Sequence, residues 1–123
     1  MPTTVLIVDD HAGFRTRAKR ALELDGFDVV GEAGDVAEGL TETERLHPDV
    51  VLLDIHLPDG SGLDAAPRFS GGDPASRVVL ISTYDEVDVA LAACERGVVG
   101  FLPKAELSGS TLTAMLAAPP SAS

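Results

Sequence analysis

Two stretches of sequence decide the fold: VLIVDD at residues 5–10 and VVLLD at residues 50–54. Each is an apolar run that ends on aspartate, which is typical of a strand buried on both faces of a parallel sheet. Parallel strands end at the same edge of a sheet, so we expect Asp9, Asp10 and Asp54 to converge there. Like charges about 4 Å apart repel by roughly 4 kcal/mol at an effective dielectric near 20, so this cluster requires a cation or a proton.

Further strand-like runs lie at residues 29–33, 78–81 and 98–102, with segments of helical length between the runs. Residues suited to helix ends punctuate these segments: Gly26 ends the first, Asp35 and Asp85 cap the second and fourth, Pro67 shortens the third, and Ser108 caps the last. This alternation predicts an α/β fold with a single doubly wound five-stranded parallel sheet. The order 2-1-3-4-5 makes the first and third strands neighbours.

Length and charge restrict the possible functions. The 123 residues fit one domain, which we expect to span residues 1–118 and to be followed by a disordered tail, PPSAS, at residues 119–123. The formal net charge of −11 opposes direct binding to nucleic acid. Cys94 is the only cysteine, so no internal disulfide can form. With neither a signal peptide nor a membrane span at the N-terminus, we expect a cytoplasmic protein.

The acidic cluster predicts a metal site. Hard carboxylate oxygens with open coordination positions suit Mg²⁺, which is commonly held by one or two carboxylates and a phosphate. The alternative is that each aspartate only caps the helix or turn that follows it. That alternative explains any one of the three aspartates more easily than all three together.

Two more polar side chains are expected at the same edge. Lys104 follows the fifth strand, where its ammonium could pair with Asp54 or with an added phosphoryl group. Ser82 ends the fourth strand, and its hydroxyl could donate to phosphoryl oxygens. A solvated lysine and a turn-forming serine would each be ordinary alone. Their position relative to the aspartates favours a shared site.

The chain resembles the receiver domain of two-component response regulators in five elements that follow one another in the expected order. They are Asp9-Asp10, the segment DIHLPDGSG at residues 54–62, Ser82, Phe101 and Lys104. The motifs VDDH at residues 8–11 and GFLPKAEL at residues 100–107 are similar to the NarL-type branch, whose members usually carry a helix-turn-helix output domain. The resemblance spans essentially the whole chain and implies a flavodoxin-like fold. We expect a stand-alone receiver; a receiver trimmed from a DNA-binding regulator is the alternative.

The resemblance also implies a role for each site residue. Asp54 would be the phosphoacceptor, taking its phosphoryl group from a histidine kinase or a phosphotransfer protein. The ligands of Mg²⁺ would be Asp10 directly, Asp9 through water, Asp54, and the backbone carbonyl of His56. Lys104 and Ser82 would hold the phosphoryl oxygens, with Thr83 as a less favoured candidate beside Ser82.

Phosphorylation would then act as a switch. By the same resemblance, Ser82 moves toward the phosphate and Phe101 turns inward, which remodels the face of the fourth helix, fifth strand and last helix. That face would contact an unidentified downstream protein, and a homodimer could form on phosphorylation. A plain core role for Phe101 is the alternative. His56 and Tyr84 occupy the positions that modulate hydrolysis of the acyl phosphate, and their bulk predicts slow hydrolysis.

Two other classes of function compare less well with the sequence. An aspartate-nucleophile phosphatase would need a carboxylate where His56 stands, and a flavin carrier would need a phosphate-binding loop after the first strand. We therefore expect no independent enzyme, only catalysis of its own phosphorylation and dephosphorylation. Thr83 and Ala105 depart from the usual receiver pattern, which leaves open an interaction module that works without phosphorylation.

Overall fold

A computed structural model describes residues 2–71, 75–83 and 98–117 of the chain. Its main sheet is parallel, and its strands lie in the order β2-β1-β3-β6-β7. The strands are β1 (Thr4–Val8), β2 (Asp28–Ala33), β3 (Val50–Asp54), β6 (Arg77–Ser82) and β7 (Gly100–Pro103). Numbered one to five along the chain, these strands lie in the order 2-1-3-4-5. This confirms the predicted order, in which the first and third strands are neighbours.

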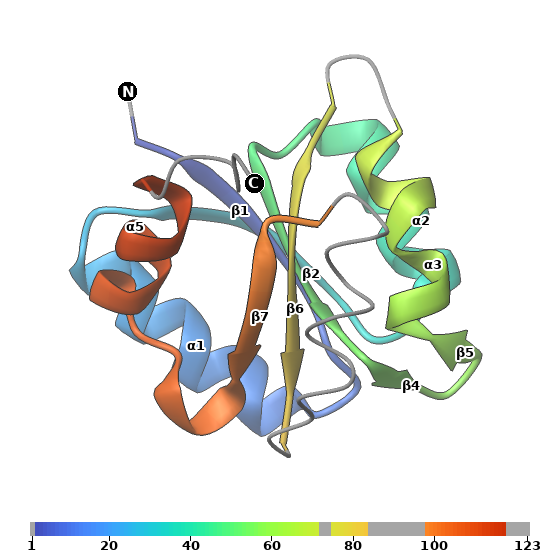
Figure 1. The fold of residues 1–123 in the computed structure, drawn as a ribbon, viewed down its shortest axis with the longest axis horizontal. Helices are drawn as coiled ribbons and strands as arrows, with labels where there is room; N and C mark the ends of the chain where they lie inside the picture. Colours follow the sequence, from blue (N-terminus) through green and yellow to red (C-terminus); the bar gives the residue numbers. More distant parts are fainter. Residues whose placement is uncertain (1, 72–74, 84–97, 118–123) are drawn as a thin grey trace, which may run out of the picture.

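Helices cover both faces of the sheet (Figure 1). On one face lie α1 (Ala12–Leu24) and α5 (Gly109–Ala117), and on the other lie α2 (Val36–Leu46) and α3 (Gly62–Ser70). The predicted doubly wound α/β fold is therefore confirmed. No helix in the described parts of the chain is long and apolar enough to cross a membrane. Three predictions lie outside the described residues: the helix after Asp85, the roles of Tyr84 and Cys94, and the tail at residues 119–123.

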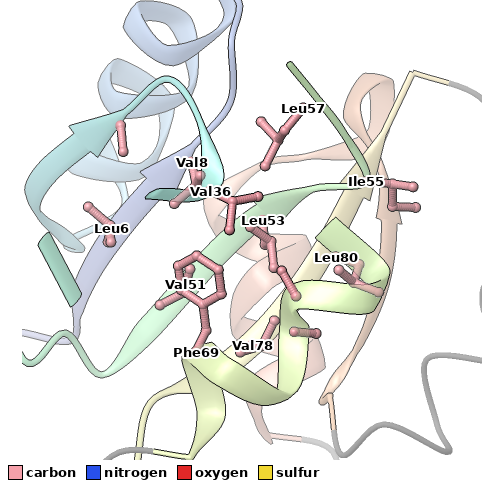
Figure 2. Close-up of a cluster of buried hydrophobic side chains, with 13 residues drawn as sticks. Leu6, Val8, Val36, Val51, Leu53, Ile55, Leu57, Phe69, Val78 and Leu80 are labelled. Atoms are coloured by element: carbon pink, nitrogen blue, oxygen red, sulfur yellow. The ribbon is translucent and has the colours of Figure 1, made fainter. Parts of the chain in front are cut away.

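The apolar runs are continuous because both faces of each central strand are buried. In β1, Leu6 and Val8 pack with α2 and α3, whereas Val5 and Ile7 pack with α1 and α5. Figure 2 shows the first of these two clusters, with Phe69 of α3 lying over the sheet. The two packed layers fix the strand ends, and so they fix where the aspartates emerge.

Three helix ends confirm the predicted capping residues. The Asp35 side chain accepts a hydrogen bond from the backbone N–H of Glu38 at 2.7 Å, at the start of α2. The Ser108 hydroxyl accepts from the N–H of Thr111 at 3.1 Å, at the start of α5. Gly26, at φ +92°, follows the end of α1 in a backbone conformation that glycine adopts at low cost.

The predicted bounds of the fifth strand were wrong. The run at residues 98–102 predicted a strand, but β7 spans Gly100–Pro103, because parallel pairing with β6 begins at Gly100 opposite Val79. Before the strand begins, the Val99 N–H donates a hydrogen bond to the Val78 carbonyl at 2.8 Å, and its side chain packs against the core. β7 lies at the sheet edge, as the missing N–H of Pro103 requires.

A short hairpin after β3 was not predicted. It pairs β4 (His56–Leu57) with β5 (Gly60–Ser61) around the turn at Pro58 and Asp59, and it leads into α3. The Gly62 N–H donates to the Ile55 carbonyl at 2.8 Å. A Cβ atom on Gly62 would lie 2.0 Å from the Asp54 carbonyl oxygen, closer than any real contact. Only glycine allows this loop to fold back beneath Asp54.

We predict that Gly62→Ala lowers the free energy of unfolding by about 1–3 kcal/mol, the usual cost of forcing extra volume into a packed site. Chemical denaturation followed by circular dichroism measures this change. Gly13→Ala is the matched control, because Gly13 is an exposed position of α1 and its new methyl group would lie at an ordinary 3.4 Å from Arg17. Equal stability of the two variants would contradict the assigned role of Gly62.

Candidate functional site

The three predicted acidic side chains meet at one edge of the sheet. β1 and β3 are neighbours, with Val8 opposite Leu53, so Asp9 and Asp54 emerge side by side. Four residues each place one possible metal-ligand atom within 4.8 Å of the others: Asp9, Asp10, His11 and Asp54. We call these four residues the acidic cluster. The expected convergence is confirmed, and His11 is an addition to it.

The two central carboxylates are buried and partly satisfied by the backbone. Asp9 is fully buried and Asp54 is 2% exposed, while 34% of the Asp10 side chain is exposed. The Asp9 Oδ1 atom accepts a hydrogen bond from the His11 N–H at 2.8 Å, and the Asp54 Oδ1 atom accepts one from the His56 N–H at 3.1 Å. Each carboxylate is therefore oriented by the loop that follows its own strand.

Lys104 lies between the remaining two oxygens. Its ammonium is 2.5 Å from Asp9 Oδ2 and 3.3 Å from Asp54 Oδ2, and it lies 4.8 Å from the centre of the Phe14 ring. Pairing with Asp54 was predicted from the sequence, whereas the shorter contact with Asp9 was not. One ammonium against three carboxylates leaves the cluster with two uncompensated negative charges when the imidazole of His11 is neutral.

The electrostatics of Asp54 reflect this imbalance. Burial raises the pKa of the Asp54 carboxyl above its usual value, and the neighbouring charge of Asp9 raises it further. The His56 N–H and the Lys104 ammonium favour the ionised form but do not cancel these two effects. Ionised Asp54 is thus less favourable in the folded chain than in the unfolded chain.

These residues fit a divalent cation. The cluster offers hard carboxylate oxygens, and Asp9 Oδ2 is buried without a hydrogen bond from any described residue, although the Lys104 ammonium lies close to it. The exposed edge of Asp10 leaves room for water on the ion. The arrangement could therefore hold Mg²⁺ next to the Asp54 carboxylate.

The other predicted residues lie around the cluster in different environments. Ser82 is fully buried at the end of β6, one residue beyond Ile81, which pairs with Asp54. Thr83 is exposed and borders the groove described below. Phe101 is half-buried on β7, where it packs against the cluster of Figure 2. His56 is exposed in β4.

A groove of about 850 Å³ opens beside the acidic cluster. It runs between the first turns of α1 and the 3₁₀ helix η1 (Lys104–Glu106), and its lining includes Asp10, His11, Phe14 and Lys104. The acidic cluster is open to solvent on the side of this groove.

Two further interactions were missed from the sequence. Arg15 donates from Nη1 to the Asp9 carbonyl at 2.5 Å and pairs through Nε with Glu32 at 3.1 Å, which ties α1 to the end of β1. Asp59 accepts hydrogen bonds from the first two N–H groups of α2, at 2.8 and 3.0 Å, and these bonds lower the pKa of its carboxyl. No local pattern signals either contact, because each partner comes from another element.

With this fold and site, the chain belongs to the response regulator receiver domain family, whose model matches residues 5–117. The nitrate/nitrite response regulator protein NarL of Escherichia coli is 33% identical over 104 residues, which cover 84% of this chain. Response regulator GacA of Pseudomonas viridiflava is 36% identical over 101 residues, 81% of this chain. The chain spans about half the length of both relatives, 48% and 47%.

A solved structure supports the same assignment. The signal receiver domain of the response regulator NarL from Mycobacterium tuberculosis superposes with a TM-score of 0.81 at 33% sequence identity. The match covers 95% of this chain and 98% of that domain. The NarL-type resemblance drawn from the motifs is therefore confirmed.

The raised pKa of Asp54 leads to a prediction about stability. A carboxyl whose pKa is raised by folding costs stability when ionised, and this cost disappears as pH falls below the value in the unfolded chain. We therefore expect Asp54→Asn, in Mg²⁺-free buffer at neutral pH, to raise the melting temperature by a few degrees. The gain should shrink as pH falls through the raised pKa toward 3.8, the ordinary value.

Thermal unfolding at a series of pH values measures this difference. Glu44→Gln, which removes an exposed negative charge on α2, controls for the change in net charge. A lower melting temperature for Asp54→Asn at neutral pH would show that the ionised carboxylate stabilises the fold.

Proposed function

We propose that this chain is a phosphoacceptor signalling protein of a two-component system, in which Asp54 receives a phosphoryl group in an Mg²⁺-dependent reaction. The donor would be the phosphohistidine of a histidine kinase or a phosphotransfer protein. One observation carries the proposal: the buried Asp54 carboxylate shares Lys104 with a second buried carboxylate, in a cluster whose negative charge is not balanced.

The two oxygens of Asp54 have different hydrogen-bond donors, and in this proposal they have different tasks. The His56 N–H donates to Oδ1 and the Lys104 ammonium donates to Oδ2. We assign the attack on phosphorus to Oδ2, because the Lys104 ammonium can turn from this oxygen to the incoming phosphoryl group. An oxygen–phosphorus bond forms as the phosphorus–nitrogen bond of the phosphohistidine breaks, and the departing imidazole nitrogen keeps the electron pair. Mg²⁺, when bound, would stabilise negative charge on the transferring group. The ion would be held by the side chains of Asp10, Asp9 and Asp54 and by the backbone carbonyl of His56.

Lys104 is placed to respond to the transfer. Before it, the ammonium contacts Asp9 and Asp54. After it, the former Asp54 Oδ2 belongs to an acyl phosphate, whose more highly charged oxygens are the stronger partners for an ammonium. Ser82 would donate to another phosphoryl oxygen. The pairing of Lys104 would thus differ between the two states.

We propose that this difference is passed on through Ser82 and Phe101. Phe101 lies on edge strand β7, so its packing can change the surface that β7 and α5 present to a downstream protein. A homodimer on phosphorylation is one form that this contact can take. The bulk of His56 and Tyr84 would slow hydrolysis of the acyl phosphate.

In this proposal the protein is cytoplasmic and catalyses only its own phosphorylation and dephosphorylation. Because the proposed site residues all lie between residues 9 and 104, the same role holds for a stand-alone chain and for the receiver of a longer DNA-binding regulator.

Intact mass spectrometry tests the proposal. We expect the protein, incubated with Mg²⁺ and a small phosphodonor such as phosphoramidate, to gain the mass of one phosphoryl group. Asp54→Asn should show no adduct, because the amide oxygen is a poor nucleophile. Asp64→Asn, which changes an exposed acid on α3, is the matched control and should gain the same mass as the wild type. Removing Mg²⁺ with a chelator should suppress the adduct.

Two outcomes would overturn the proposal. An adduct that persists in Asp54→Asn would place the acceptor elsewhere. A wild-type chain that gains no mass with Mg²⁺ and any of several donors would instead support an interaction module that works without phosphorylation.

A further inference from the structure

We propose that Phe14 is a positioning residue for phosphoryl transfer, because the face of its ring holds the Lys104 ammonium in the site while that ammonium changes partners. The inference rests on the proposed function, in which Lys104 turns from Asp54 to the phosphoryl group. The ammonium lies over the Phe14 ring, 4.8 Å from its centre. This is within the distance of about 6 Å at which the face of an aromatic ring attracts a cation.

The fold brings these two side chains together from opposite ends of the chain. Phe14 lies in the first turn of α1, and Lys104 begins η1 directly after β7. Both side chains line the groove beside the acidic cluster, and Phe14 also packs against the core on this face of the sheet. The ring is therefore anchored, whereas the lysine reaches it on a long and flexible stem.

The surroundings of the ammonium favour such a contact. Only 11% of the Lys104 side chain is exposed, so water has little access to it. Its two polar contacts are with the carboxylate oxygens of Asp9, at 2.5 Å, and Asp54, at 3.3 Å. The attraction between a cation and a ring face is stronger where water is excluded. Phe14 thus offers the ammonium a third partner in place of water.

A ring face suits an ammonium that must change partners. The hydrogen bond from Lys104 to Asp54 Oδ2 is directional, and it must break when the ammonium turns to a phosphoryl oxygen. The attraction of the ring comes from its whole negative face, so it tolerates a small movement of the cation. Phe14 can therefore attract the ammonium before and after the transfer, and it keeps the ammonium from turning into the groove.

The competing explanation is that Phe14 only fills volume in the core. Site-specific incorporation of mono-, di- and trifluorinated phenylalanine at position 14 separates the two explanations. Fluorine withdraws electrons from the ring face and so weakens its attraction for a cation, while the size of the ring changes little. A residue that acts only through its volume would be insensitive to this series.

The rate at which the Asp54 adduct forms is the functional measurement, taken by intact mass spectrometry with phosphoramidate in excess Mg²⁺. Circular dichroism confirms that each variant is folded. We expect the rate to fall step by step with fluorination, by about threefold for the trifluorinated ring and about fivefold or more for Phe14→Leu. Phe14→Tyr keeps the ring face and should restore the rate to within about twofold of the wild type.

Phe27 provides the matched control. It packs against the same core cluster as Phe14, but it precedes β2 at the opposite end of the sheet from the acidic cluster, where Asp28 pairs with Thr4. Phe27→Leu and a trifluorinated ring at position 27 should both form the adduct at the wild-type rate.

NMR checks the contact itself without any phosphorylation. In the wild type, the ring current of Phe14 should shift the Cε protons of Lys104 upfield. This shift should be lost in Phe14→Leu and kept in Phe27→Leu.

Three results would count against the inference. A trifluorinated Phe14 variant that forms the adduct as fast as the wild type overturns it alone, since the ring would then act only through its volume. Lys104 resonances that do not change in Phe14→Leu also overturn it, because the ammonium would then not lie over the ring. A wild type that forms no adduct refutes the proposed function, and this inference falls with it.

Discussion

The repulsion between Asp9 and Asp54 at the carboxyl edge of the sheet is the constraint on which the site depends. Both carboxylates are buried, and Lys104 is shared between them. Because burial weakens the hydration that would otherwise screen these charges, the imbalance raises the pKa of the Asp54 carboxyl. In the function proposed above, a divalent ion and a phosphoryl group on Asp54 are the partners that would balance this charge.

The rest of the fold holds this unfavourable cluster in place. The central strands are buried on both faces, so their ends cannot separate without exposing the core. The loop after β3 is fixed twice, by Gly62 folding beneath Asp54 and by Asp59 bonding to the start of α2. Arg15 fixes the end of β1 through the Asp9 carbonyl. A stable scaffold thus maintains a site that is itself costly.

Much of this arrangement could be predicted from the sequence because it depends on local patterns. The runs before Asp9 and Asp54 predicted neighbouring buried strands, and strand order then predicted that the carboxylates meet. The hairpin around Asp59 and the contact of Lys104 with Asp9 could not be predicted, since they depend on how loops pack against distant elements. His11 was visible in the motif, but only the side-chain geometry brought its ring to the carboxylates.

The most direct test of this account is the Mg²⁺ dependence of the free energy of unfolding, measured for the wild type beside Asp10→Asn. An ion that binds only the folded chain adds about 1.4 kcal/mol for each tenfold rise in concentration above its dissociation constant. The account predicts this rise for the wild type, and for Asp10→Asn only at Mg²⁺ concentrations at least about tenfold higher. The account would be contradicted by a free energy of unfolding that does not change with Mg²⁺, or by one that rises over the same range of Mg²⁺ concentration in both proteins.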